Sequence, residues 1–178
     1  MIPGVPTPLY SHAGRGDFRD VYEPAEDSFL LMDALEQDAQ PLRVPGGGIG
    51  LWSGVSSGME DLTVSCASRC TDVNPAAARC TAETASRNRV PLQSAGRASR
   101  AWAGGLRGRE VTDRLLPLVG RLLSAAGLFY LVTIAENRPD DIQILGQQGL
   151  TGEPCLTTRA GNERLSILRF HRSPENTT

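Results

Sequence analysis

The sequence has no surplus of charge of either sign. Its 178 residues include 18 Lys+Arg and 20 Asp+Glu, which gives a net charge of −2. Proteins that bind nucleic acid over a broad surface usually carry a basic excess, and the composition argues against that class. Any nucleic acid substrate would have to be bound locally. The length allows one domain with its own core and is too short for two large domains.

Long hydrophobic runs are also missing. No stretch approaches the roughly 18 apolar residues of a membrane span. Residues 1–6, Met-Ile-Pro-Gly-Val-Pro, lack the charged start and the apolar stretch of a secretory signal. We therefore expect an intracellular protein with no membrane partner.

Cysteine is scarce. Cys66, Cys70, Cys80 and Cys155 are too few and too irregularly spaced for a disulfide scaffold. Cys66 and Cys70 could be neighbours on a helix or half of a metal site. No second pair and no histidine cluster completes such a site, so we predict no bound metal.

What the sequence does contain is an acidic residue where a strand is predicted to end. Asp72 is followed by Asn74, a preferred N-cap, and by Pro75, which fits the first position of a helix over residues 76–88. In an open α/β sheet, a carboxylate at a strand's carboxyl end can accept hydrogen bonds from both ribose hydroxyls. Asp72 is therefore a candidate nucleotide-binding residue, although an ordinary surface turn would look similar.

A second candidate site lies at the start of a predicted helix. Residues 22–28, Tyr-Glu-Pro-Ala-Glu-Asp-Ser, place Pro24 in its first turn and acidic residues at the positive end of its dipole. Tyr22 and Ser28 could face a ligand there; a plain capped helix is the alternative. Residues 1–21 show no periodicity, which predicts an extended N-terminal arm.

Two segments show no regular pattern. Within residues 40–69, the glycine-rich run 45–54 follows no recognisable strand, and a phosphate loop needs a strand before its glycines. Flanking prolines argue against a central strand at this point. Residues 94–100, Ser-Ala-Gly-Arg-Ala-Ser-Arg, indicate a flexible basic loop.

The C-terminal half alternates helices with strands. A helix from about Gly108 to Leu123 is predicted with one buried stripe, formed by Val111, Leu115, Leu118 and Leu122. Residues 128–134 form an apolar strand of the kind that is buried on both faces. A helix from Pro139 is predicted to end with Gly149 as its cap.

Two further strands are predicted after this helix. They lie around residues 155–158 and 165–170, and residues 160–163, Ala-Gly-Asn-Glu, are a plausible hairpin turn between them. The whole pattern predicts an α/β sheet with an antiparallel edge.

Four segments together resemble the eukaryotic HemK-like methyltransferases. They are residues 22–31 (Tyr-Glu-Pro-Ala-Glu-Asp-Ser-Phe-Leu-Leu), 70–75 (Cys-Thr-Asp-Val-Asn-Pro), 101–105 with 108–111 (Ala-Trp-Ala-Gly-Gly and Gly-Arg-Glu-Val) and 127–134 (Gly-Leu-Phe-Tyr-Leu-Val-Thr-Ile). The resemblance implies an incomplete α/β, class I (Rossmann-like) methyltransferase with a C-terminal antiparallel hairpin. It implies one such domain over residues 22–172, after an arm of residues 1–21 and before a tail of residues 173–178.

The resemblance also implies a cofactor, a substrate and a partner. By position in the family motifs, Tyr22, Glu26 and Ser28 would lie near the methionine part of S-adenosyl-L-methionine, and Asp72 would bind the ribose hydroxyls. The family methylates a glutamine side-chain amide in a Gly-Gly-Gln loop of the translation release factor. Histone lysine and adenine in DNA have also been proposed as targets. The family works in the cytoplasm and nucleus as a heterodimer with a small zinc-binding activator subunit.

The chain departs from the family in two places. The family's cofactor loop, Leu-Glu-Val-Gly-Ser-Gly-Ser-Gly, is absent. We hypothesise that residues 45–54 are a frame-shifted copy, because the loop's codons read one nucleotide earlier encode Pro-Gly-Gly-Gly-Ile-Gly-Leu-Trp-Ser-Gly. The Asn-Pro-Pro-Tyr motif that orients the target nitrogen is also absent, and a short basic stretch replaces its segment between Gln93 and Ala101.

These departures leave two other functions open. No residue is assigned a catalytic role, so one alternative is an inactive variant that only binds the activator subunit or other partners. The other is an unstable product without function, because helix faces that lose a strand have no surface to pack against.

Overall fold

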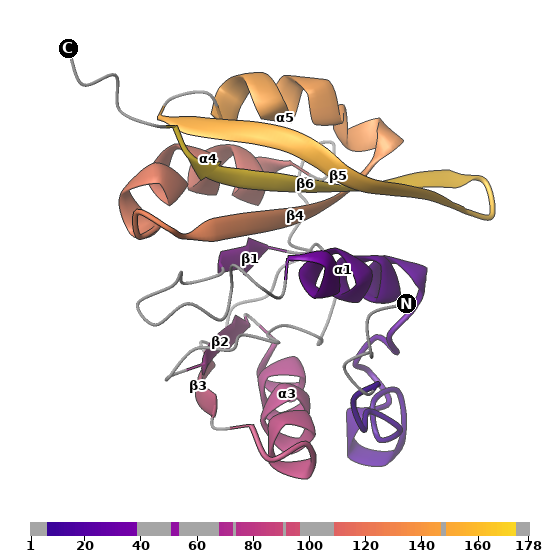
Figure 1. Ribbon diagram of the computed structural model, residues 1–178. Coiled ribbons are helices and arrows are strands. Elements are labelled where there is room, and N and C mark those ends of the chain that lie inside the picture. Colours follow the sequence, from indigo (N-terminus) through magenta and orange to yellow (C-terminus); the bar gives the residue numbers. More distant parts are fainter. Residues whose placement is uncertain are drawn as a thin grey trace.

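The structure is a computed structural model that describes residues 7–38, 51–53, 68–72, 74–90, 92–96, 109–146 and 149–173. These residues form an α/β fold with two sheets, ordered β1-β4-β6-β5 and β2-β3 (Figure 1). The strands are β1 (Leu51–Ser53), β2 (Ser68–Asp72), β3 (Leu92–Gly96), β4 (Leu128–Ile134), β5 (Leu150–Ala160) and β6 (Glu163–Arg172). The helical elements are η1 (Gly16–Phe18), α1 (Glu26–Gln37), α3 (Pro75–Arg87), α4 (Glu110–Leu122), η3 (Ala135–Asn137) and α5 (Pro139–Gly146).

Strand β4 lies inside the larger sheet, because its side chains are apolar on both faces. It pairs in parallel with β1 and antiparallel with β6. Phe129 and Leu131 pack with α4 and α5, whereas Tyr130 packs with α1. The sheet is therefore the middle of three layers (Figure 1). The predictions of a doubly buried strand and of an α/β sheet with an antiparallel edge are confirmed.

Strands β5 and β6 form the predicted C-terminal hairpin. Ala160 pairs with Glu163, and Gly161 between them has a φ of 59°. A glycine with positive φ in the first of two loop positions is the preference of a type II′ turn, whose twist matches that of the strands. Both strands extend beyond residues 155–158 and 165–170, because backbone pairing continues past the apolar residues on which the prediction depended.

The predicted buried stripe of α4 is wrong at Leu118 and Leu122. Leu115 of that stripe is partly buried against the core, and the side chain of Val111 lies outside what the structure describes. Leu116, Val119 and Leu123 are at most 2% exposed, whereas Leu118 is 50% and Leu122 is 53% exposed. The helix carries two neighbouring apolar stripes, and the periodicity of its apolar residues is compatible with burial of either stripe. Packing against β4 and α5 selects the stripe that contains Leu116.

Segments predicted to be irregular contribute to both sheets. Residues 40–69 include β1 and the first two residues of β2, and residues 94–96 belong to β3. Strand β3 has the sequence Leu-Gln-Ser-Ala-Gly and little apolar character. It is a strand because its backbone pairs in parallel with β2, which periodicity does not reveal.

Two predicted helix ends are wrong. Helix α1 begins at Glu26 after Ala25, so Pro24 precedes the first turn. Helix α5 ends at Gly146, and Gly149, with a φ of 84°, lies just before β5 and does not cap the helix. Helix α3 agrees with its prediction to within one residue. Of the helices in the described ranges, none is both long and apolar enough to span a bilayer.

The N-terminal segment is not an extended arm over residues 7–21. It folds through turns and η1, and it lies beside α3 and below α1 in Figure 1. Ala13 and Val21 are buried in one cluster with Ala77 and Cys80 of α3. The small side chains of α3 let the segment approach closely, which its irregular sequence did not indicate.

Candidate functional site

The amino end of α1 lies toward the carboxyl end of β4. At the other end of the helix, Asp38 bonds to Tyr130, which is near the start of β4. Tyr22, just before α1, lies within electrostatic range of Glu163. Glu163 precedes Leu165, the residue that pairs with the last residue of β4. Ligands of open α/β sheets bind at the carboxyl ends of the strands, so the amino end of α1 faces the expected site.

A partly buried polar network fixes the other end of α1. The Tyr130 hydroxyl donates to Asp38 Oδ2 at 2.6 Å, and Arg169 Nη1 donates to Asp38 Oδ1 at 2.6 Å. Arg169 also pairs with Glu153 on β5. Burial first, and then the hydrogen bond and the charge of Asp38, raise the pKa of Tyr130 above its ordinary value. Tyr130 therefore stays a neutral donor and anchors the helix to the sheet.

Three predicted cofactor residues gather at the mouth of α1. Tyr22 is 48% exposed, and Glu26 is also exposed. Ser28 is half-buried, and both its backbone N–H and its hydroxyl donate to Asp27 Oδ1, at 2.8 and 3.4 Å. Asp27 therefore holds the Ser28 hydroxyl at the first turn of the helix.

The mouth is negatively charged. Partial burial raises the pKa of Tyr22 above 10.0, and the charges of Asp27, Glu26 and Glu163 raise it further. A site with this field favours a cationic group and keeps the tyrosine neutral. Asp27 and Glu163 were not chosen as candidates from the sequence. Asp27 lies within the predicted helix start, residues 22–28, whereas Glu163 reaches the mouth only through the hairpin.

The predicted strand end at Asp72 and the predicted helix start at Asn74 and Pro75 are confirmed. Asp72 is the last residue of β2 and pairs with Gly96 of the parallel strand β3. Asn74 Oδ1 accepts a hydrogen bond from Ala76 N–H at 3.0 Å, and Pro75 is the first helical residue. The side chain of Asp72 lies outside what the structure describes, so its ribose-binding role stays a prediction.

The N-terminal segment contacts both helices that follow the candidate regions, α1 and α3. Val21 is 2% exposed and belongs to the buried cluster that includes Ala76 and Ala77, from the first turn of α3. The residue that precedes Tyr22 is therefore buried in the same cluster as residues of α3.

The described side chains provide no metal site and no activated thiol. No three His, Cys, Asp or Glu side chains gather in the described ranges as a metal would require. Burial raises the pKa of the Cys80 and Cys155 thiols, which makes both unreactive at neutral pH. The side chains of Cys66 and Cys70, residues 45–50 and residues 101–105 lie outside the described part.

Comparison with known proteins identifies relatives along almost the whole chain. No family model matches the sequence. Methyltransferase HEMK2 from Mus musculus is 43% identical over 215 positions, covering 96% of this chain and 99% of the relative. HEMK2 from Homo sapiens is 42% identical, with 94% and 97% covered. The eRF1 methyltransferase catalytic subunit mtq2 of Schizosaccharomyces pombe is 32% identical, with 93% and 95% covered.

A solved structure supports the fold. The E. cuniculi Mtq2–Trm112 complex, responsible for methylation of the translation termination factor eRF1, superposes with a TM-score of 0.50. The match covers 86% of this chain and 99% of the other at 20% identity. It confirms the predicted class I, Rossmann-like architecture. At 32–43% identity to three named methyltransferases over nearly its full length, this chain belongs to the eukaryotic HemK-like methyltransferase family.

Proposed function

We propose that this protein transfers a methyl group from S-adenosyl-L-methionine to a glutamine side-chain amide of the release factor eRF1. It does so as a heterodimer with a small activator subunit of the Trm112 type. The observation that carries the proposal is similarity over 93% of the chain to a protein named as the catalytic subunit of an eRF1 methyltransferase. The structural neighbour, a Mtq2–Trm112 complex, supports the partner.

The chemistry of the α1 mouth fits this cofactor. S-adenosyl-L-methionine carries a cationic sulfonium and a cationic ammonium group, and when bound it supplies an electrophilic methyl group. Glu26, Asp27 and Glu163 provide the negative field around neutral Tyr22. Tyr22, Glu26 and Ser28 would hold the methionine part. Asp72, at the end of β2, would accept hydrogen bonds from the ribose hydroxyls.

A second function, partner binding without methyl transfer, is favoured by what the sequence lacks. The chain has no Asn-Pro-Pro-Tyr motif, and orientation of the reacting nitrogen supplies much of the rate in such a transfer. The mouse relative aligns over 215 positions, more than the 178 residues of this chain, so the relative carries segments missing here. In this case the chain binds the activator subunit and competes with an active relative.

Calorimetric titration of the full chain with S-adenosyl-L-methionine tests cofactor binding. We expect saturable binding that Asp72→Asn weakens by about 10- to 100-fold in Kd, because hydrogen bonds to a charged acceptor are lost. Asp33→Asn, an exposed acid on the outer face of α1, is the matched control and should bind like the wild type. Equal affinity of Asp72→Asn and wild type would remove Asp72 from the site.

A transfer assay separates the two functions. The chain, co-expressed with a Trm112-type subunit, is incubated with labelled S-adenosyl-L-methionine and eRF1. Label on eRF1, lost when the glutamine of its Gly-Gly-Gln loop is replaced, supports the enzyme. Co-purification of the subunit without label on eRF1 supports the binding function. Absence of both label and co-purification contradicts both functions.

The same assay extends to the other targets that the family resemblance implies. Histone lysine and DNA adenine are proposed as further substrates, and zinc is proposed to be bound by the activator subunit. Residence in both the cytoplasm and the nucleus would give the chain access to all three substrates. Fractionation of cells that express the tagged chain tests this localisation.

A further inference from the structure

We propose that three residues of the N-terminal segment, Leu9, Tyr10 and His12, form a clasp that joins α3 to α1 and thereby positions the two halves of the cofactor site. The inference rests on the proposed function, because it assigns the clasp a role in binding S-adenosyl-L-methionine. Its residues are positioning residues, since they act through Tyr22 and α3.

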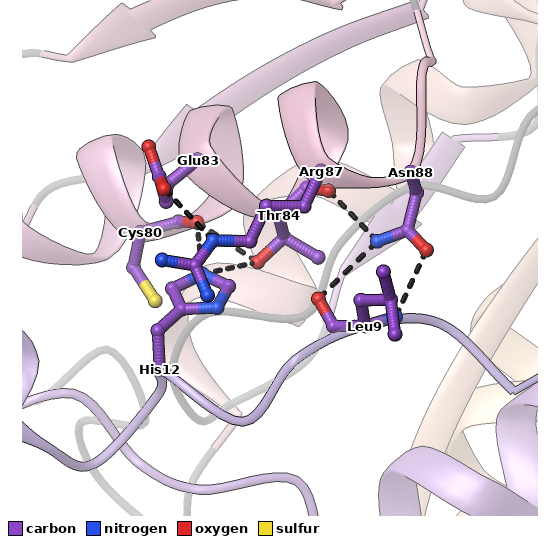
Figure 2. Close-up of polar contacts among 7 residues, drawn as sticks. All are labelled: Leu9, His12, Cys80, Glu83, Thr84, Arg87 and Asn88. Atoms are coloured by element: carbon purple, nitrogen blue, oxygen red, sulfur yellow. Dashed lines mark hydrogen bonds and ion pairs between the residues drawn. The ribbon is translucent and has the colours of Figure 1, made fainter.

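The first contact of the clasp pairs Leu9 with the carboxyl end of α3. Leu9 N–H donates to Asn88 Oδ1 at 2.9 Å, and Asn88 Nδ2 donates back to the Leu9 carbonyl at 3.3 Å (Figure 2). Asn88 Nδ2 also donates to the Thr84 carbonyl at 2.8 Å. One side-chain amide therefore satisfies both backbone groups of Leu9, as a neighbouring strand would, and is itself fixed by the helix.

The second contact joins His12 to the middle of α3. His12 Nε2 lies 3.0 Å from Thr84 Oγ1 and 3.3 Å from the Cys80 carbonyl (Figure 2). The Thr84 hydroxyl donates to the same carbonyl at 2.9 Å, so its oxygen is left to accept from His12. A carbonyl only accepts, which assigns the ring hydrogen to Nε2. The ring is buried and meets the edge of Phe18, which fixes its orientation.

The third contact connects the same segment to α1. Tyr10, between Leu9 and His12, places its ring edge-to-face with Phe29 of α1, with ring centroids 6.1 Å apart. Aromatic pairs with this geometry attract each other beyond the area they bury. Three residues within positions 9–12 thus contact two helices that lie beside different sheets.

The clasp matters because the two sheets that the structure describes share no strand. In the described ranges, β2 and β3 pair with each other and with no strand of the larger sheet. The predicted ribose ligand, Asp72, is on the smaller sheet, whereas Glu26 and Ser28 are on α1 beside the larger one. Tyr22 follows Val21, which is buried with α3. If the segment loosened, Tyr22 and the β2–α3 turn would shift relative to α1.

The test uses two pairs of variants of the full chain. Tyr10→Leu removes the ring contact, and Tyr10→Phe keeps it. Thr84→Val removes the hydroxyl that accepts from His12, and Thr84→Ser keeps it. Arg87→Ala breaks the exposed Arg87–Glu83 pair on the same helix and is the control. Hydrogen–deuterium exchange of residues 7–22 reports the clasp, and calorimetry reports the Kd for S-adenosyl-L-methionine.

We expect Tyr10→Leu and Thr84→Val to speed exchange in residues 7–22 and to raise the Kd by about two- to tenfold, the effect of losing one net contact of this kind. Tyr10→Phe, Thr84→Ser and Arg87→Ala should stay within about twofold of wild type. Unchanged exchange in the first two variants would overturn the clasp. Faster exchange with an unchanged Kd would overturn its positioning role.

The two proposals fail in different ways. If the wild type does not bind S-adenosyl-L-methionine, the proposed function fails, and this inference fails with it. If the wild type binds and all variants bind equally well, this inference alone fails.

Discussion

Tyr130 is a phenol that its surroundings keep neutral. It is 1% exposed, and its hydroxyl donates to Asp38 while Arg169 holds the other carboxylate oxygen. Ionisation would place a negative charge in an apolar cluster next to Asp38, which is why the pKa of Tyr130 is raised above 10.0. Ionisation of the Tyr130 hydroxyl would break the hydrogen bond that anchors α1 to the sheet, so this contact depends on pH.

We predict a specific loss of stability in alkali. Because the folded-state pKa of Tyr130 is raised, its contribution to stability is fully present below the unfolded value of 10.0 and is lost as the pH rises above it. The free energy of unfolding, measured by urea denaturation from pH 8 to 11, should therefore fall above about pH 10. Tyr130→Phe should weaken that fall and cost about 0.5–1.5 kcal/mol at neutral pH.

The control for this measurement is Tyr22→Phe. Tyr22 is half exposed, so water screens the charges that raise its pKa, and the variant should keep most of the alkaline fall of the wild type. If Tyr130→Phe and the wild type lose stability equally between pH 10 and 11, ionisation of Tyr130 is not the cause of the alkaline loss of stability.

At the scale of elements, α4 shows how a helix with two apolar stripes is oriented. Leu116 and Val119 fill the layer between the helix and β4, together with Phe129, Leu131 and Phe170 from the sheet. Leu118 and Leu122 point away from this layer. The larger sheet offers one apolar face to this side, and only one stripe can meet it.

Alanine substitutions at Leu116 and Leu118 should therefore differ strongly. Leu116→Ala leaves a cavity in a packed layer and should lower the free energy of unfolding by about 2–5 kcal/mol. Leu118→Ala removes a half-exposed side chain and should change it by about 0.5 kcal/mol or less. Both changes in the free energy of unfolding are measured by denaturant titration. The variants are compared at the same slope of free energy against denaturant concentration. A larger loss for Leu118→Ala than for Leu116→Ala would restore the stripe predicted from the sequence.

At the scale of the whole molecule, the side chains that the structure describes form unequal cores beside the two sheets. The larger sheet is covered by two clusters rich in Leu, Ile, Phe and Tyr. The cluster beside α3 consists of Ala13, Val21, Ala77 and Cys80, with Phe18 and Ala76 partly buried. Small side chains bury little apolar area, so this unit gains less from folding. We infer that the unit around α3 opens more easily than the larger sheet.

Native-state hydrogen exchange in rising denaturant measures this difference. We expect the amides of α3 to exchange through an opening of lower free energy than those of β4 and β6, whose amides should require global unfolding. Bound S-adenosyl-L-methionine should reduce the gap, because it would contact both units. Equal opening free energies in the apo chain would mean that the two sheets unfold as one unit.

Around the candidate site, the sequence predicted the features that depend on residues adjacent in the chain. Asn74 caps α3 as predicted, because N-caps depend on adjacent residues. Strand β4 and the hairpin turn were also predictable, since each depends on local pattern. The acid Glu163 at the α1 mouth was not predictable, because it arrives from a hairpin distant in the chain.

The sequence by itself determined the family, the alternation of helices and strands, the N-cap of α3 and the central apolar strand, because these depend on residues close together in the chain. The tertiary structure alone decided that α4 turns its Leu116 stripe inward, that Leu92–Gly96 is a strand and that the N-terminal segment clasps α3. These depend on which surfaces meet. A side chain's neighbours in space, unlike its neighbours in sequence, are fixed only when the whole chain has packed.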